Sequence, residues 1–231
     1  MDYLINFFSR YGQSIIDGTL TTLWIVPTSL ICGLFLAFPL GILMASKVKL
    51  IYKLPAFIFS YVFRGTPMLI QLYIIYYALG LWISEWQNLS PFMENLLKNK
   101  LFWGILTFAL NTAAYTSEII RGAIENTPKG EIEAAKSFGM TKLQINKRVI
   151  FPNLIRQALP AYGNEVIFML HGSAIISTIA VVDLTQAVKV AYFKTYEPYL
   201  PFITAGIIYL SITIIIFSIF KLLEKVLYKH Y

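Results

Sequence analysis

GEIEAAKSFGMTKLQINKRVIFP, residues 130–152, is a charged, helix-forming stretch in the middle of an otherwise apolar chain. Residues 131–138 are good helix formers without a breaker, and Gly139 suits a helix C-terminus because glycine adopts the left-handed conformation at little cost. Thr141 can cap a second helix, and Pro152 either ends that helix or turns the chain into the next segment. The stretch therefore predicts two short helices joined at a glycine, a shape suited to docking. An amphipathic pair lying on a membrane surface is the alternative.

The composition of the whole chain indicates a membrane protein. Of its 231 residues, 57% are hydrophobic and 13% are charged, whereas a soluble domain carries about a quarter charged residues. A helix needs about 20 apolar residues to cross the hydrocarbon core of a bilayer. Five stretches are long enough, at about 18–46, 54–84, 101–122, 154–182 and 198–220. We therefore predict an all-α integral membrane protein with five transmembrane helices, in which residues 123–153 form a connecting loop.

The lysines and arginines predict the orientation of these spans. Thirteen of the 19 lie in the connections 47–53 and 121–156 and in the tail after Phe220, and five lie in the connections on the other side. Because cytoplasmic loops carry the excess of basic residues, the N-terminal segment 1–17 is expected outside and the tail 223–231 in the cytoplasm. The net charge of +7 is then an orientation signal and not a nucleic-acid-binding one. The aromatic-rich first segment fits an interfacial helix on the outer surface or a frayed end.

Ionisable residues inside the spans mark candidate functional positions, since they are costly in the hydrocarbon core. In the second span, Arg64 and Gln71 are seven residues apart and share a helix face, and a glycine and a proline between them loosen the helix. We expect either a kinked helix that lines a cavity or an arginine locked to a glutamate. In the third span, Glu118 shares a face with Asn111 and Tyr115 near the cytoplasmic end, which favours a structural or gating role.

The fourth span carries the second acidic residue, Glu165. It lies at a depth close to that of Arg64, so its carboxylate can meet a cationic group of a substrate or form a salt bridge to Arg64. His171 shares the helix face of Asn164 and not that of Glu165. Its alternatives are a role in the pathway and an ordinary hydrogen bond between helices. Residues 172–173, Gly-Ser, can open the helix at that point.

The charged insert also resembles a known motif. It reads Glu-Ala-Ala, three residues, Gly139, nine residues, Val149, one residue, Phe151-Pro152. This pattern resembles the EAA loop of ATP-binding-cassette (ABC) importer permeases, with other apolar residues at Val149 and Phe151. In that family the loop forms coupling helices that dock into a groove on the cytoplasmic ATPase. The resemblance implies the same coupling role here for Glu131, Glu133, Ala134, Ala135, Gly139 and Pro152.

Three further stretches resemble signatures of the polar amino acid permeases, in the same order. They are FRGTP at 63–67, AYTSEIIRGA at 114–123 and PAYGNEVI at 160–167. Commoner amino acid permeases have Gln where this chain has Glu131 and Lys where it has His171. With these residues the chain looks most like permeases of histidine/lysine/arginine/ornithine and opine importers, which implies a cationic amino acid or opine as the substrate.

The resemblance implies a type I ABC importer permease in a bacterial inner membrane, with its N-terminus in the periplasm. The expected partners are a cytoplasmic ATPase dimer, a homologous permease subunit in a heterodimer, a periplasmic amino-acid-binding protein and membrane lipid, but no nucleic acid. No metal or cofactor is expected. The residues expected along the substrate pathway are Arg64, Thr66, Gln71, Glu118, Asn164, Glu165, His171 and Ser173.

Several other functions are disfavoured by motifs that the sequence lacks. It has no phosphate-binding loop of the form GxxxxGK[ST], so ATP hydrolysis would need a separate subunit. It has no zinc-ligand spacing and no nucleophile elbow, so an enzyme is not expected. The alternative is an ion-gradient-driven secondary transporter or a channel subunit, although such proteins usually have more spans or inverted repeats. A membrane scaffold would not need charges inside its spans. The lone Cys32 can form no internal disulfide and is expected in the core.

Overall fold

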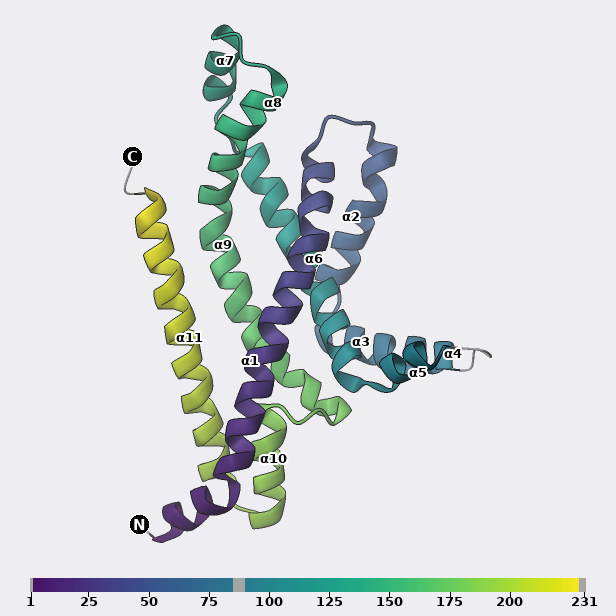
Figure 1. Cartoon of the computed structure of the whole chain (residues 1–231), viewed down its shortest axis with the longest axis vertical. Helices are drawn as coiled ribbons and strands as arrows, with labels where there is room; N and C mark the ends of the chain where they lie inside the picture. The colour runs from purple at the N-terminus through teal and green to yellow at the C-terminus, as the bar shows by residue number, and fades with distance from the viewer. Residues whose placement is uncertain (1, 85–89, 229–231) are drawn as a thin grey trace.

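The computed structural model describes residues 2–84 and 90–228, and every regular element in these ranges is a helix (Figure 1). The expected all-α fold is thus confirmed. The elements are α1 (Asp2–Ala45), α2 (Leu50–Gly65), α3 (Met68–Tyr73), η1 (Ile74–Leu79), α4 (Gly80–Ser84), α5 (Pro91–Lys98), α6 (Lys100–Glu125), α7 (Lys129–Ser137), α8 (Lys142–Ile145), η2 (Asn146–Ile150), α9 (Phe151–Gly172), η3 (Ser173–Ile179), α10 (Leu184–Thr195) and α11 (Tyr199–Tyr228). Of the η segments, η1 and η2 are π-helical and η3 is a 3₁₀-helix.

Helix α6 is the centre of the fold and packs against α1, α2 and α9. Its contact with α1 is close because small residues recur every four positions along α1, at Gly33, Ala37 and Gly41. A Cβ atom on Gly33 would lie 2.9 Å from the Ala109 carbonyl oxygen, and one on Gly41 would lie 2.7 Å from that of Ser117. Small residues allow such backbone approach between membrane helices, where packing contributes most to association.

Cys32 precedes this stripe on α1 and is exposed, so the expectation that it belongs to the core was wrong. The physical reason is helical geometry, because successive residues of a helix point about 100° apart. Only the face that carries the small residues meets α6.

The N-terminal segment is helical and continuous with α1, and Figure 1 shows its first turns at an angle to the rest of that helix. Phe7 and Tyr11 are buried against Val188 and Ala191 of α10, whereas Phe8 is exposed. The segment therefore packs on its own protein through one aromatic face. A frayed end, the other alternative from the sequence, is not what the structure has.

The second predicted span is broken instead of merely kinked. The axis turns by 108° between residues 50–65 and 68–79. Thr66 is extended, with φ −118° and ψ 146°, as expected for a residue before proline, and Pro67 lacks the N–H that would continue the helix. The helix-face argument that joined Arg64 to Gln71 therefore does not apply across the break.

The insert has the expected turn, and α7 begins at Lys129, two residues before the predicted start. Gly139 has φ +73°, its N–H donates to the Lys136 carbonyl, and the Met140 N–H donates to the Ala135 carbonyl. This pair of bonds is a Schellman motif. Thr141 caps α8 in a capping box with Gln144, as the sequence predicts for a second helix.

Pro152 does not end that second helix. The backbone stays helical from α8 through η2 into α9. The π-helical turn immediately before Pro152 gives the reason, since a wider turn accommodates the missing N–H and the bulk of the ring. The second arm of the insert is thus continuous with α9.

Two of the described helices, α1 and α11, are long and apolar enough to cross a membrane alone. Up to four spans result if each bent pair counts as one, the pairs being 50–65 with 68–79 and 142–179 with 184–195. Helix α6 is not in this set. It carries polar residues that are buried against neighbouring helices, including Asn111, Thr112 and Thr116, and these make it less apolar than α1 and α11.

Candidate functional site

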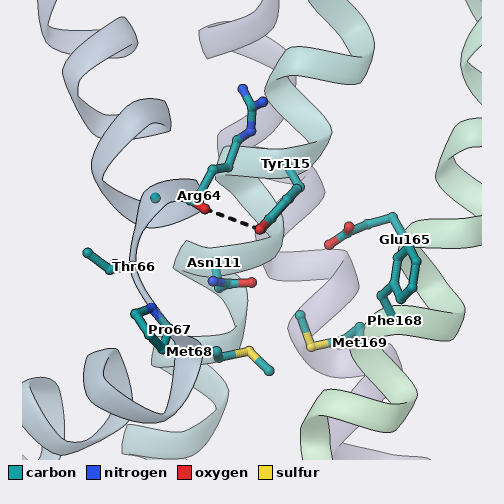
Figure 2. A pocket seen from close by; sticks show the side chains of 10 residues that line it. Arg64, Thr66, Pro67, Met68, Asn111, Tyr115, Glu165, Phe168 and Met169 are labelled. Atoms are coloured by element: carbon teal, nitrogen blue, oxygen red, sulfur yellow. Dashed lines mark hydrogen bonds between the residues drawn. The ribbon is translucent and has the colours of Figure 1, made fainter.

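A cavity of about 590 Å³ opens where the second span breaks. Its walls come from the α2–α3 break, from α6 and from α9 (Figure 2). The lining residues are Arg64, Gly65, Thr66, Pro67, Met68, Asn111, Tyr115, Glu165, Phe168 and Met169. The cavity thus brings together three of the residues predicted for the substrate pathway, Arg64, Thr66 and Glu165.

Glu165 supplies the carboxylate of this cavity. The residue is only 7% exposed, and Figure 2 shows its carboxylate pointing inward from α9 towards Tyr115. Within residues 2–84 and 90–228 it forms no salt bridge. The alternative of a pair with Arg64 is therefore not realised, and no cationic side chain of these ranges pairs with the carboxylate.

Arg64 pairs with the other acidic residue. Its Nη1 lies 3.2 Å from Glu118 Oε1, and its guanidinium carbon lies 5.7 Å from the centre of the Tyr115 ring. In Figure 2 the guanidinium turns away from Glu165. An arginine locked to a glutamate and a kinked helix that lines a cavity were alternatives from the sequence. The structure has the ion pair and also has Arg64 in the cavity lining, with a break where a kink was expected.

Glu118 continues this pairing along α6. Its other oxygen lies 2.7 Å from Arg121 Nη2, and Arg121 Nη1 lies 2.6 Å from Glu125 Oε2. Two arginines and two glutamates thus alternate from the cavity wall to the end of α6. The charge of Arg64 is compensated within this row, which leaves Glu165 as the cavity residue without a compensating charge.

Two amides hold the break in the second span. Gln71 Nε2 donates to the Phe63 carbonyl at 2.7 Å and to Thr66 Oγ1 at 2.8 Å. Asn111 Nδ2 donates to Gln71 Oε1 at 2.9 Å. An unwound backbone is tolerated at membrane depth only where its freed polar groups find partners. Gln71 does not line the cavity. It stabilises the break that shapes the cavity through these hydrogen bonds.

The remaining pathway candidates lie elsewhere. Asn164 is exposed in a groove between α9 and α11. His171 is also exposed, and its Nε2 lies 3.0 Å from Thr213 Oγ1 of α11. Ser173 is buried and donates to the Leu170 carbonyl at 2.7 Å. It begins the 3₁₀ segment η3, so the helix changes at Gly172–Ser173, the place where the sequence predicts an opening.

Three apolar lining residues were not predicted, namely Met68, Phe168 and Met169. The last two follow Glu165 by three and four positions and so share its helix face, a signal that the sequence did contain. Met68 had no such signal, because its place depends on the angle of the break.

The insert forms a second candidate site. Asn153 Nδ2 donates to Glu131 Oε2 at 2.6 Å, which ties the start of α7 to α9. A cavity of about 390 Å³ lies between the arms, lined by Ala134, Ala135 and Pro152 among others. The tips carry exposed apolar side chains, Phe138 at 82% and Leu143 at 77%. Such exposure favours contact with another surface.

No cluster of three metal-ligating side chains occurs among the residues that the structure describes.

Residues 37–227 match the family described as binding-protein-dependent transport system inner membrane component. The chain belongs to this family. It is 38% identical over 208 residues to the histidine/lysine/arginine/ornithine transport system permease protein HisM of Escherichia coli, covering 90% of this chain and 86% of that one. It is 41% identical over 213 residues to the nopaline transport system permease protein NocM of Agrobacterium fabrum, covering 91% and 86%.

Solved structures agree with these relatives. The crystal structure of an amino acid ABC transporter with histidines matches 94% of this chain and 96% of its own, with a TM-score of 0.82 and 32% identity. The inward-facing MetNI methionine ABC transporter matches 93% of this chain and 96% of its own, with a TM-score of 0.76. Because its identity is 18%, this match supports the fold alone. The chain is a permease subunit of an ABC transporter and not an enzyme, and the ATPase is a separate subunit.

Proposed function

We propose that this chain is the permease subunit of an ATP-driven importer for cationic amino acids or opines. The observation that carries the substrate class is the cavity carboxylate of Glu165, which has no ionic partner in the described chain, beside an arginine already paired to Glu118. At about 4 Å and an effective dielectric of 20, unlike charges attract by about 4 kcal/mol, and like charges repel as strongly. The cavity therefore favours a positive group and disfavours an acidic side chain.

Aromatic residues support the same class of substrate. Tyr115 and Phe168 line the cavity near Glu165, and aromatic faces attract guanidinium and ammonium groups. The relatives named above transport histidine, lysine, arginine and ornithine, or nopaline. In this proposal Arg64, Thr66 and Glu165 contact the passing substrate, and Gln71, Glu118 and Ser173 hold the walls. Asn164 and His171 line a separate face towards α11.

The proposed topology has five spans, formed by α1, by the broken helix from α2 to α4, by α6, by α9 with η3, and by α11. The N-terminal segment 1–17 would lie in the periplasm, and the loop 123–153 and the tail 223–231 in the cytoplasm. Figure 1 supports this sidedness, since the insert and the end of α11 lie at one end of the long axis and the N-terminus at the other. The basic connections cluster at the insert end, as the positive-inside rule requires.

The proposed partners follow from the family and from the insert. Helices α7 and α8 would be the coupling helices, docking on an ATPase dimer through Ala134 and the exposed tips, while the buried Ala135 lets the two arms pack closely. Glu131 would hold the two arms together through Asn153. Glu133 and Pro152 flank the docking face. A homologous permease in a heterodimer, a periplasmic amino-acid-binding protein and surrounding lipid complete the importer.

Uptake by the reconstituted complex tests this function. Proteoliposomes holding this chain, its partner permease, the ATPase and the binding protein receive radiolabelled arginine, lysine, histidine, ornithine, nopaline, glutamine or glutamate. We expect ATP-dependent uptake of the cationic compounds and little uptake of glutamate. Uptake that follows an imposed ion gradient without ATP would favour the secondary transporter, and preferred uptake of glutamate would contradict the substrate class.

A further inference from the structure

A second cavity of about 660 Å³ lies at the insert end, away from the substrate cavity. It is enclosed by the end of α1, the end of α6 and the run from α8 to the start of α9. The apolar part of its lining, here called the floor, consists of Phe38, Ile42, Ala45, Ile124, Ile150, Phe151 and Leu154, and the exposed tip residue Leu143 borders it. The rings of Phe38 and Phe151 meet edge to face with centroids 6.4 Å apart. The floor can therefore hold a hydrocarbon chain.

The rest of the lining, here called the rim, is polar and positively charged. It consists of Ser46 and Lys47 after α1 and of Asn146 and Lys147 in η2. Among the described residues, none that lines the cavity is acidic, and neither lysine forms an ion pair. Two uncompensated lysines above an apolar floor match a molecule with an anionic head and an apolar tail.

We propose that this cavity binds an anionic phospholipid of the cytoplasmic leaflet. The phosphate lies between Lys47 and Lys147, and an acyl chain lies along the floor. The partial exposure of Phe38, Ile42 and Phe151 continues the apolar floor to the outside of the helices, so a chain can enter from the bilayer. Basic pockets between membrane helices on the cytoplasmic side are suited to anionic headgroups.

The position of this cavity means that a bound lipid would affect how the insert is held. Its walls include η2, the wide turn through which the insert continues into α9, and the end of α6. A bound lipid would therefore brace the insert against α1. This goes beyond the proposed function and needs only the proposed sidedness, so lipid binding can be measured without transport.

Native mass spectrometry of the whole importer tests the proposal. The complex is released from nanodiscs that contain equal amounts of phosphatidylglycerol and phosphatidylcholine. We expect retention of phosphatidylglycerol over phosphatidylcholine, and a loss of about 30-fold in that preference for the double variant Lys47→Gln/Lys147→Gln. Lys47→Arg/Lys147→Arg keeps both charges and should keep the preference, which guards against a loss caused by misfolding.

The control removes two charges from the same end but outside the cavity, as Lys129→Gln/Lys225→Gln. An equal loss in this control would overturn the proposal, since it would show general attraction to a basic surface. Displacement of the lipid by millimolar inorganic phosphate would also overturn it, in favour of a free-anion site. A disulfide formed by an added oxidant between Ile150→Cys and a cysteine introduced into the partner permease, on a Cys32→Ser background, would overturn it in favour of a protein occupant.

Discussion

Replacing Gly139 by alanine isolates the role of the turn between α7 and α8. With φ +73°, Gly139 has a conformation that costs other residues about 1–2 kcal/mol. An added Cβ would have nothing within 4 Å, so steric contact contributes nothing and the whole cost lies in the backbone. If the ATPase docks only on the formed turn, the affinity of the permease for the ATPase should fall about 5- to 30-fold.

Two matched variants define this effect. Gly130→Ala lies within α7, where a Cβ also meets nothing within 4 Å, and it should be neutral or stabilise the helix by about 0.5–1 kcal/mol. Gly139→Asn should recover much of the affinity, because asparagine tolerates the left-handed conformation.

Two measurements read out the turn, namely the affinity of the purified permease pair for the ATPase and the ratio of substrate transported to ATP hydrolysed. Gly139→Ala should lower both while the subunit still inserts in the membrane. Unchanged affinity and ratio in that variant, or equal losses in Gly130→Ala, would refute the coupling role of the turn.

Three further outcomes follow from the packing, the ion pairs and the topology. Gly41→Ala should destabilise the subunit by about 1–3 kcal/mol in thermal unfolding, because its Cβ would lie 2.6 Å from an Ile120 methyl group, whereas Gly12→Ala meets nothing and should be neutral. Glu118→Gln removes the carboxylate that compensates Arg64, so the guanidinium should repel a cationic substrate and arginine uptake should fall more than glutamine uptake. Equal losses of the two uptakes would indicate a purely structural role for Glu118. On a Cys32→Ser background, cysteines placed in the insert or the tail should resist an impermeant thiol reagent added outside, and labelling there would reverse the proposed topology.

Local rules predicted the insert well. The positive φ of Gly139 and the cap at Thr141 depend on neighbours within a few residues, so they can be predicted from sequence. The π-turn before Pro152 was missed, since proline was expected either to end the helix or to turn the chain into the fourth span. The proline rule allows the wider turn as another solution, and tertiary packing decides between them.

The cavity shows where sequence reasoning reached its limit. Helix-face spacing predicted that Glu165 and His171 lie on different faces of the fourth span. The structure agrees, because Glu165 lines the cavity whereas His171 contacts Thr213 of α11. The choice of Glu118 as the partner of Arg64 depends on how α2 packs on α6, which no local pattern encodes. The extended conformation of Thr66 was available from the proline that follows it, but the size of the bend was not.

The most direct test of the central claim is ATP-driven arginine uptake by the reconstituted importer carrying Glu165→Gln. A hydrogen bond to a charged group contributes about 1.5–3 kcal/mol, so we predict that uptake falls about 10- to 100-fold relative to the unaltered chain. Glu224→Gln removes a carboxylate from the α9–α11 groove and should leave uptake unchanged. Arginine uptake at the normal rate by Glu165→Gln, in a complex that still assembles with its ATPase, would contradict the claim that this cavity selects cationic substrates.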